Sequence, residues 1–410
     1  MADDSDIPPA GQRQHFRTRL THAGRGGTKA LGFVNPPVLR GSTMLYPTIA
    51  DREAAKNRPL ERVPGYGING NATHWALEDV IAEIEGGTRC RIVSTGLAAI
   101  TTPLLAYLSA GDHCLMPDSI YGPGRKFADV AMKRFGIETT YYDPLVDEAG
   151  MAALIRPNTR VVYTESPGSI TFEVQDIPAI ARAAHARGAK VFMDNTWGLH
   201  FFQPFRHGVD VSIQALTKYA GGHSDVMLGS ITTNTTEDFE RVHATLRALG
   251  QYASPDDCWL CLRGLRTLGV RLQAQMEAGI EVAHWLRGRP EVAHVLHPAL
   301  NGAPGHALWK RDFTGASSLF GLVLKPEYSE EASHAMVNAL QLFGIGSSWG
   351  GYESLLTSTT GNFTRTAGTG RFHGPVLRVH IGLEDPADLI ADLENGFAVL
   401  RAYRSEALEE

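Results

Sequence analysis

Residues 210–225 read DVSIQALTKYAGGHSD and place a lysine shortly after an apolar strand. Val211–Ala215 is short and apolar, which is typical of a strand buried in a sheet, and Lys218 and the pair Gly221-Gly222 follow it closely. Burying an ammonium group is costly unless it faces a cleft or takes part in chemistry. Lysine amines form Schiff bases with carbonyl compounds, although for this segment alone a lysine that extends to solvent at a strand end is the simpler interpretation.

Three further segments carry polar or aromatic residues at the ends of expected strands. Lys190-Val-Phe-Met-Asp194 is a strand that ends in an aspartate, Ser94-Thr-Gly-Leu97 is a strand-to-helix turn, and Tyr121 lies in another such loop. Pyridoxal phosphate needs a carboxylate at its pyridinium nitrogen, an aromatic ring can stack on it, and backbone N–H groups at a helix start bind phosphate. Because open α/β sheets bind ligands beyond the carboxyl ends of their strands, these segments and Lys218 together predict a pyridoxal phosphate site.

The chain between residues 76 and 260 alternates short apolar strands with helices. This order is typical of βαβ units, so it predicts an α/β domain with a largely parallel sheet that helices cover on both faces. The expected strands are Cys90–Ser94, His113–Met116, Thr139–Tyr142, Arg160–Thr164, Lys190–Met193 and Val211–Ala215, and the expected helices include Ala76–Glu85, Leu97–Ser109, Arg125–Phe135 and Ile177–Arg187.

Two regions flank this part of the chain. The first dozen residues are polar with two prolines and are expected to be disordered. Residues 30–75 are rich in Gly, Pro and Asn and, being too long for an ordinary connection, form either a functional segment or an arm that reaches another subunit. Residues 261–410 contain fewer strands with helices grouped beside them, which predicts a smaller C-terminal α+β domain. The elements expected there are a long or broken helix at Asp257–Arg287, strands at Val292–Leu296, Leu319–Leu324 and Leu377–Ile381, and helices at Glu330–Leu342 and Pro386–Tyr403.

The composition argues against several classes of protein. The 410 residues include 38 Lys and Arg and 44 Asp and Glu, a formal net charge of −6, so no basic footprint for nucleic acid is present. No apolar run approaches the roughly 18 residues of a membrane span, and the N-terminus lacks the apolar core of a signal peptide. The four cysteines are too few for a disulfide framework. We therefore expect a soluble, cytoplasmic protein.

Neither a metal site nor a nicotinamide site is expected. Cys258-x-x-Cys261 has no second pair and lies in an apolar helix, so packing is the preferred interpretation. His294 and His297 have no carboxylate nearby in the sequence and are expected on the surface or in loops. Gly65-Tyr-Gly-Ile-Asn-Gly70 has the glycine spacing of a dinucleotide site, but a proline precedes it and no helix start follows, which argues against that site.

Six segments are long enough that chance does not explain their likeness to a known family. They are Tyr163-Thr-Glu-Ser-Pro-Gly-Ser-Ile170, Met193-Asp-Asn-Thr-Trp197, Val211-Ser-Ile-Gln-Ala-Leu-Thr-Lys-Tyr219, Arg263-Gly-Leu-Arg-Thr-Leu-Gly269, Trp349-Gly-Gly-Tyr-Glu-Ser354 and Arg378-Val-His-Ile-Gly-Leu-Glu384. From about residue 30 to residue 400 the chain resembles the Cys/Met-metabolism enzymes of pyridoxal-phosphate fold type I, most closely the cystathionine β-lyase branch. The resemblance implies a large α/β domain with the cofactor, a smaller C-terminal domain and an N-terminal arm.

The resemblance implies a role for each matching residue around pyridoxal 5'-phosphate. Lys218 would bind the cofactor as a Schiff base and, once freed, would move the Cα proton of the substrate. Asp194 would pair with the pyridinium nitrogen, and Tyr121 would stack on the ring. The phosphate would be held by the backbone N–H groups of Gly96 and Leu97 and by the Thr217 hydroxyl.

The same resemblance implies the substrate side of the site and an oligomer. Arg378 would bind the α-carboxylate of an amino-acid substrate bidentately, a geometry that a guanidinium suits, and Ser348 would assist it beside Ser347 and Trp349. Tyr66 would reach the phosphate from a neighbouring subunit and would act with Lys218 and Tyr121 in catalysis. This gives the arm a purpose and implies an obligate dimer with shared active sites, usually paired into a homotetramer.

Two positions depart from the family pattern. The family usually has Tyr-x-Arg, with the arginine also on the phosphate, where this chain has Tyr66-Gly-Ile68. Losing one charged hydrogen bond costs about 1.5–3 kcal/mol unless Asn69, Asn71 or another group compensates. β-Lyases usually have Tyr-Ser-Trp where this chain has Ser347-Ser-Trp349, which removes a phenol from the substrate side and opens space.

Two reactions therefore remain open. The resemblance implies cleavage of a C–S bond in a sulfur-containing amino acid, as in β-elimination from an L-cystathionine-like substrate. The departures leave open a γ-elimination or γ-replacement on a bulkier γ-activated amino acid, such as S-adenosylmethionine, in a specialised pathway. A pyridoxal-binding scaffold without chemistry and a nicotinamide oxidoreductase are weaker alternatives, because Lys218, Asp194 and Arg378 occur together and the glycine motif is misplaced.

Overall fold

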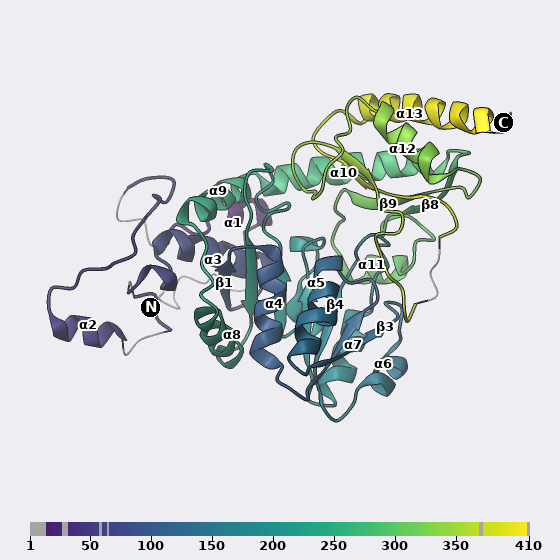
Figure 1. The fold of residues 1–410 in the computed structure, drawn as a ribbon. Coiled ribbons are helices and arrows are strands. Elements are labelled where there is room, and N and C mark those ends of the chain that lie inside the picture. The colour runs from purple at the N-terminus through teal and green to yellow at the C-terminus, as the bar shows by residue number, and fades with distance from the viewer. Residues whose placement is uncertain (1–13, 27–31, 57–59, 64, 369–371, 408–410) are drawn as a thin grey trace.

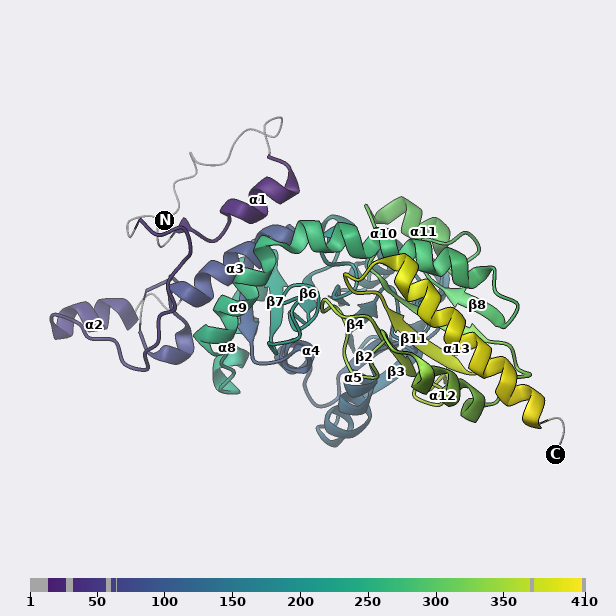
Figure 2. The ribbon, with the colours of Figure 1, turned by 90° about the horizontal axis from the view of Figure 1, so that it is seen from above.

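The computed structural model describes residues 14–26, 32–56, 60–63, 65–368 and 372–407. Figures 1 and 2 show two β-sheets with helices packed around them and one short helix, α2 (Ile49–Lys56), that projects away from the rest of the chain. The disorder expected for the first dozen residues falls outside the described residues. No helix in these ranges is long and apolar enough to cross a membrane.

The larger sheet has seven strands in the order β1-β7-β6-β5-β4-β2-β3. The five strands from β6 to β3 run parallel to one another, so the carboxyl ends of β4, β5 and β6 meet at one edge of the sheet. β7 is antiparallel to both of its neighbours, β1 and β6. The strands are β1 (Arg89–Val93), β2 (His113–Pro117), β3 (Glu138–Tyr142), β4 (Thr159–Glu165), β5 (Lys190–Asp194), β6 (Val211–Gln214) and β7 (Gly229–Thr233).

Helices cover both faces of this sheet, as expected. Successive residues of β4 point to opposite faces: Val161 and Tyr163 pack in one hydrophobic core with α4 and α8, whereas Val162 packs in the other with α3 and α7. The helices of this part are α3 (Ala72–Glu85), α4 (Gly96–Tyr107), α5 (Gly122–Phe127), α6 (Glu148–Leu154), α7 (Ile177–His185), α8 (Thr236–Ala248) and α9 (Pro255–Arg266), with a π-helical turn, η4 (Ala128–Met132), after α5.

The smaller sheet has four antiparallel strands in the order β10-β11-β9-β8. Its core is formed with α10, α12 and α13, and Figure 2 shows α13 lying along this sheet. The elements are α10 (Leu268–Arg287), β8 (Val292–Leu296), α11 (His306–Asp312), β9 (Leu319–Leu324), α12 (Glu330–Ala339), β10 (Leu355–Ser358), β11 (Val376–His380) and α13 (Pro386–Ala407). The N-terminal region adds α1 (Phe16–His22), α2 and a 3₁₀ turn, η3 (Gly67–Asn69).

The structure corrects several details of the sequence analysis. β7 was missing from the expected strands because its sequence, GSITT, has no apolar run, although all five residues are buried between β1 and β6. β10 was missing for a similar reason, since it is short and half-buried. His297 lies in the loop directly after β8, one of the two positions expected for it, but its side chain is fully buried, and its Nδ1 accepts a hydrogen bond from the Ala299 N–H at 3.1 Å. A shielded imidazole of this kind leaves no sequence signal.

The helix expected at Ala76–Glu85 begins four residues earlier, at Ala72. Asn71 caps this helix. Its side chain accepts a hydrogen bond from the Thr73 N–H at 3.0 Å, and the His74 Nδ1 accepts one from the Asn71 N–H at 3.2 Å. Of the two forms expected at Asp257–Arg287, a long or a broken helix, the structure has the broken one: it is interrupted at Thr267 into α9 and α10. Both cysteines of Cys258-x-x-Cys261 are buried in the core, in agreement with the packing interpretation.

Candidate active site

Lys218 lies in the loop after β6, where residues from both sheets meet. Its Nζ donates a hydrogen bond to Ser348 Oγ over 2.6 Å and lies 5.2 Å from the centroid of the Trp349 ring. Burial lowers the pKa of Lys218 to about 8, and the neighbouring Arg378 lowers it further, whereas Asp194 opposes the shift. The Lys218 amine therefore loses its proton, and becomes nucleophilic, at a lower pH than the amine of an exposed lysine does.

This shift gives a direct prediction for the apoenzyme. Only the neutral amine reacts with trinitrobenzenesulfonate, so labelling of Lys218 should rise with pH and reach half its maximum rate near pH 8, rather than near pH 10.5. Mass spectrometry of the labelled peptide reports the rate. Lys133, an exposed lysine, is the control; equal labelling profiles for the two lysines would contradict the environment assigned to Lys218.

Asp194 ends β5, directly beside the strand that precedes Lys218. Its Oδ1 accepts two hydrogen bonds from Thr196, from the N–H at 3.0 Å and from the hydroxyl at 2.6 Å. Burial raises the pKa of Asp194, whereas Lys218 lowers it. Oδ2 has no hydrogen-bond partner within the described ranges, so one carboxylate oxygen remains for a charged donor. Thr196, which sequence reasoning did not single out, fixes the carboxylate.

The turn between β1 and α4 forms a cradle of free amides. Thr95 caps α4 by accepting from the Ala98 N–H at 3.0 Å, while the N–H groups of Gly96 and Leu97 donate to no other described residue. A Cβ at Gly96 would lie 2.6 Å from the Cβ of Ala215, so only glycine allows the turn to pack this closely against the loop that leads to Lys218. Amides at a helix start attract a phosphate.

Thr217 is already engaged in two hydrogen bonds. Its hydroxyl donates to the Leu228 carbonyl at 3.1 Å and accepts from the Leu228 N–H at 3.0 Å. To donate to a phosphate, Thr217 would have to turn its proton away from that carbonyl.

Tyr121 stands at the start of α5 and is held by a buried glutamate. Its N–H donates to Glu165 Oε2 at 2.7 Å, and the Ser169 hydroxyl donates to Glu165 Oε1 at 2.6 Å. Burial and the neighbouring Asp194, its register partner on β5, raise the pKa of Glu165. Sequence reasoning missed Glu165, although it lies inside one of the family-like segments. It positions the backbone of Tyr121, a residue that is 43% exposed and therefore accessible to a cofactor.

Arg378 comes from the middle of β11 and faces the same region. Its Nη2 donates to the carbonyls of Ser348 at 2.9 Å and Gly346 at 3.4 Å. Among the described residues no carboxylate pairs with it, and burial lowers its pKa. A guanidinium that is largely buried without an anionic partner is a receptor for a carboxylate.

The segment around Ser348 is tightly constrained. Ser348 has a φ of 77°, a left-handed conformation that costs a non-glycine residue energy, and a Cβ at Gly350 would lie 3.0 Å from the Cα of Lys218. Arg378 and Lys218 both bond to Ser348, so this strained residue links the two cationic groups. Trp349 packs on Tyr219 with ring centroids 5.4 Å apart, and Ser347 is exposed.

Two of the expected site residues lie elsewhere in this chain. Tyr66 and Ile68 line a cavity of about 560 Å³ together with Arg40, Tyr252 and Asp256, and neither contacts Lys218. Tyr66 is 61% exposed. The structure thus brings Lys218, Asp194, Tyr121, Arg378, Ser348 and Trp349 into one region with the Gly96-Leu97 turn, whereas Tyr66 and Ile68 occupy a separate surface.

These groups fit pyridoxal phosphate. The vacant Oδ2 of Asp194 suits a protonated ring nitrogen, the free amides of Gly96 and Leu97 suit a phosphate, and the lowered pKa of Lys218 suits a Schiff-base amine. The described residues contain no group of three or more His, Cys, Asp or Glu side chains that could hold a metal ion.

Comparison with known proteins gives the same family. Cystathionine beta-lyases of Bordetella avium and Escherichia coli are 43% and 41% identical to the chain, each over 93% of it and over 96% and 98% of their own lengths. An L-alanine/L-glutamate racemase of Wolbachia pipientis is 38% identical over 93% of the chain and 96% of its own length. The crystal structure of metB from Corynebacterium glutamicum superposes with a TM-score of 0.86 at 30% identity and covers 94% of the chain and 98% of its own.

The family model described as Cys/Met metabolism PLP-dependent enzyme matches residues 17–398. This match spans both sheets and includes every residue placed at the candidate site. Since both the sequence and the fold agree over nearly the whole chain, the expected α/β fold of type I and the cofactor are confirmed. The chain belongs to the Cys/Met-metabolism family of enzymes that use pyridoxal 5'-phosphate.

Proposed function

We propose that the chain is a pyridoxal-phosphate-dependent lyase that cleaves the C–S bond of a sulfur-containing amino acid, in the manner of a cystathionine β-lyase. The observation that carries the proposal is the joint contact of Lys218 and Arg378 with Ser348. A carboxylate held by Arg378 brings the Cα of an amino acid close to the Lys218 amine. The likeness to two proteins named cystathionine beta-lyase supports this assignment.

Each residue then has a defined task. Arg378 binds the α-carboxylate and orients the substrate, and Lys218 takes the proton from Cα as a general base. When bound, pyridoxal phosphate supplies an aldehyde and an electron sink for the negative charge that this proton transfer leaves. Asp194 keeps the ring nitrogen protonated. Ser348 holds the amine of Lys218 at a fixed position, and Trp349 shields it from solvent on one side.

One observation favours the alternative of γ-elimination or γ-replacement. Ser347 is small and exposed beside the substrate side, and Ile68 carries no charge, so both departures from the β-lyase pattern leave room for a bulkier substrate. Removal of the Cα proton is common to β-elimination, γ-elimination and racemisation, so the geometry of Lys218 alone does not separate these reactions.

Product analysis separates them. The holoenzyme is incubated in turn with L-cystathionine, S-adenosylmethionine, L-alanine and L-glutamate. Release of pyruvate from cystathionine as the fastest reaction is the expected result. Faster release of methylthioadenosine from S-adenosylmethionine would favour γ-elimination or γ-replacement. Faster formation of D-amino acids would contradict both functions and indicate a racemase.

The proposal extends to the assembly and the organisation of the chain. Tyr66 acts in the active site of a neighbouring subunit, where it contacts the phosphate of the cofactor, so the enzyme is a dimer with shared sites that pairs into a homotetramer. Exposed apolar side chains on the arm support this, with Phe33 71% and Leu45 93% exposed. We place the arm at residues 1–75, the cofactor domain at 76–260 and the C-terminal domain at 261–410, and the enzyme in the cytoplasm.

Replacement of Ile68 by Arg tests the shared site. If Ile68 also faces the phosphate of the partner, Ile68→Arg should restore a charged hydrogen bond and tighten the cofactor by roughly tenfold or more. Asn71 does not already compensate, because its side chain caps α3. Equilibrium dialysis of pyridoxal phosphate and kcat/KM on the best substrate are measured for both forms.

The matched control is Ile68→Met, which adds length without charge and should leave cofactor affinity unchanged. Tighter binding of the cofactor with undiminished activity would identify an ordinary β-lyase site. Tighter binding of the cofactor with reduced activity would show that Ile68 makes space for a bulky or cationic substrate. Unchanged cofactor affinity would contradict the placement of Ile68 near the phosphate.

A further inference from the structure

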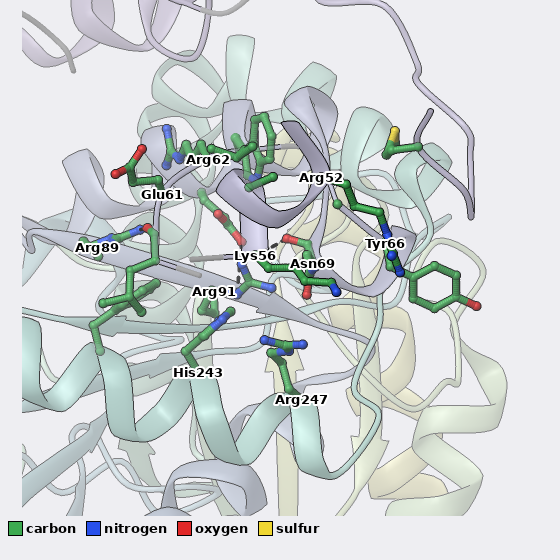
Figure 3. A pocket seen from close by; sticks show the side chains of 18 of the residues that line it. Arg52, Lys56, Glu61, Arg62, Tyr66, Asn69, Arg89, Arg91, His243 and Arg247 are labelled. Atoms are coloured by element: carbon green, nitrogen blue, oxygen red, sulfur yellow. Dashed lines mark hydrogen bonds and ion pairs between the residues drawn. The ribbon is translucent and has the colours of Figure 1, made fainter. Parts of the chain in front are cut away.

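A cavity of about 370 Å³ lies outside the candidate active site, between the arm, α3, β1 and α8 (Figure 3). This volume is within the range of small-molecule sites, roughly 300–1,000 Å³. Six of the side chains that line it are Lys or Arg, and two are Glu, so its lining is strongly cationic. We refer to it as the cationic pocket; its charged lining residues are Arg52, Lys56, Glu61, Arg62, Glu78, Arg89, Arg91 and Arg247.

Buried polar atoms in the cationic pocket lack partners. His243 is 7% exposed, and neither its Nδ1 nor its Nε2 has a hydrogen-bond partner. Arg91 is 8% exposed; its Nη1 donates to the Asn69 carbonyl at 3.4 Å, and its Nε makes no hydrogen bond but lies within ion-pair distance of Glu78. Figure 3 shows His243 and Arg247 pointing from α8 toward Arg91 and Asn69. Buried polar groups in native proteins are almost always paired, so the two unpaired ring nitrogens of His243 indicate a ligand.

The cations of the cationic pocket are only partly neutralised. Four of the six cations pair with a carboxylate: Arg52 and Lys56 with Glu53, Arg62 with Asp79 at 2.6 Å, and Arg91 with Glu78 at 3.6 Å. Arg89 donates to the Leu60 carbonyl at 2.6 Å but pairs with no carboxylate within the described ranges. Arg247 makes no hydrogen bond or ion pair with any residue that the structure describes. The burial of His243, together with the charges of Arg91, Arg247 and Arg89, lowers its pKa to about 4, so the imidazole is neutral and can donate one hydrogen bond to an anion.

We propose that the cationic pocket binds the phosphate group of a small molecule, as an anion site separate from the Lys218 site of the same chain. Tyr66, which the proposed dimer places at the cofactor phosphate of the neighbouring subunit, also lines this pocket. Guanidinium groups bind phosphate bidentately, and Arg89, Arg91 and Arg247 approach the cavity from two different elements, β1 and α8. The His243 imidazole supplies a neutral donor. This proposal does not depend on which reaction the active site performs.

The remaining lining suggests which phosphate compounds fit. Phe239 also lines the cavity, but it is only 3% exposed and its ring is covered by the Arg89 guanidinium at 3.8 Å. Tyr46 and Trp75 add aromatic side chains to the lining, so there is an apolar surface next to the cations. Such a surface stabilises an aromatic phosphate monoester more than free phosphate. Inorganic phosphate and phenyl phosphate are therefore the two probes, and their relative affinities distinguish a free phosphate from an ester.

Calorimetric titration of the holoenzyme at pH 7.5 tests the proposal, because bound pyridoxal phosphate blocks the cofactor site. We expect saturable binding of both probes and a roughly tenfold or greater rise in Kd for Arg247→Gln, which removes one charged contact. His243→Phe, of similar shape, should weaken binding in the same direction. The cofactor absorbance must stay constant during the titration.

Arg241→Gln is the matched control, since Arg241 lies on the same helix but packs over the Tyr107 ring at 4.8 Å, outside the cationic pocket. Its Kd should match that of the wild type. Absence of saturable binding up to about 10 mM, or equal affinities for the Arg247→Gln and Arg241→Gln variants, would overturn the proposal. A loss of subunit association in Arg247→Gln with unchanged phosphate affinity would also overturn it, in favour of a carboxylate of the partner subunit.

Discussion

Replacement of Lys218 by Ala is expected to lower kcat by a factor of about 10³ or more, because this side chain serves both as the Schiff-base amine and as the general base. No other lysine contacts Ser348, Trp349 or Arg378 among the described residues, so no neighbour can take over. Stopped assays with the best substrate at saturating cofactor measure the loss. Residual turnover within tenfold of the wild type would contradict the assignment.

Two controls separate a catalytic loss from a folding defect. Lys218→Arg keeps a positive charge but cannot form the Schiff base, so it should be as inactive as Lys218→Ala. Lys133→Ala removes an exposed lysine and should have no effect. Since burial disfavours the charged amine of Lys218, its removal eliminates a desolvation cost, and the thermal midpoint of the apoenzyme should stay the same or rise. A lower midpoint would indicate that the lysine supports the fold.

The cofactor side of the site could be predicted from the sequence because it depends on local patterns. Asp194 and Lys218 each follow a short apolar strand, and parallel strands bring their carboxyl ends to one edge of a sheet. Gly96 lies where a strand turns into a helix. These residues needed only the order of strands and helices, and β5 and β6 are indeed neighbours in the sheet.

The substrate side could not be derived in this way. Arg378 lies inside a strand of the smaller sheet and bonds to Ser348 of the same part of the chain, and how close this pair lies to Lys218 depends on how the two sheets pack together. Only the family resemblance pointed to it. Glu165 and Thr196 were missed because each positions another residue and has no chemical role of its own. Glu165 holds the backbone of Tyr121, and Thr196 holds the carboxylate of Asp194.

The cationic pocket shows a third limit of sequence reasoning. Arg89 and Arg91 alternate with apolar residues along β1, and such a pattern usually means a solvent-facing side of an edge strand. His243 occupies one helix face with Phe239 and Arg247. Their convergence with the arm arises from tertiary packing alone, because basic residues are spread evenly over the sequence and no cluster marks the site.

Replacement of Arg378 by Lys is expected to raise KM for the amino-acid substrate by roughly tenfold to a hundredfold, with a smaller decrease in kcat. Lysine keeps the charge but lacks the planar fork that binds a carboxylate through two parallel hydrogen bonds. It also loses the geometry that bonds to the carbonyls of Ser348 and Gly346. Steady-state kinetics on the best substrate give KM and kcat separately.

The separate effects of Arg378→Lys on KM and on kcat distinguish two roles for Arg378. If its main task is to bind the carboxylate, affinity for unreactive amino acids such as glycine should fall in parallel with the rise in KM. If its main task is to hold the strained Ser348 and thereby Lys218, the midpoint of Lys218 labelling should shift instead, while glycine still binds. Arg156→Lys, at an exposed pair with Glu138, is the control and should change neither quantity. Unchanged KM in Arg378→Lys would show that the carboxylate binds elsewhere.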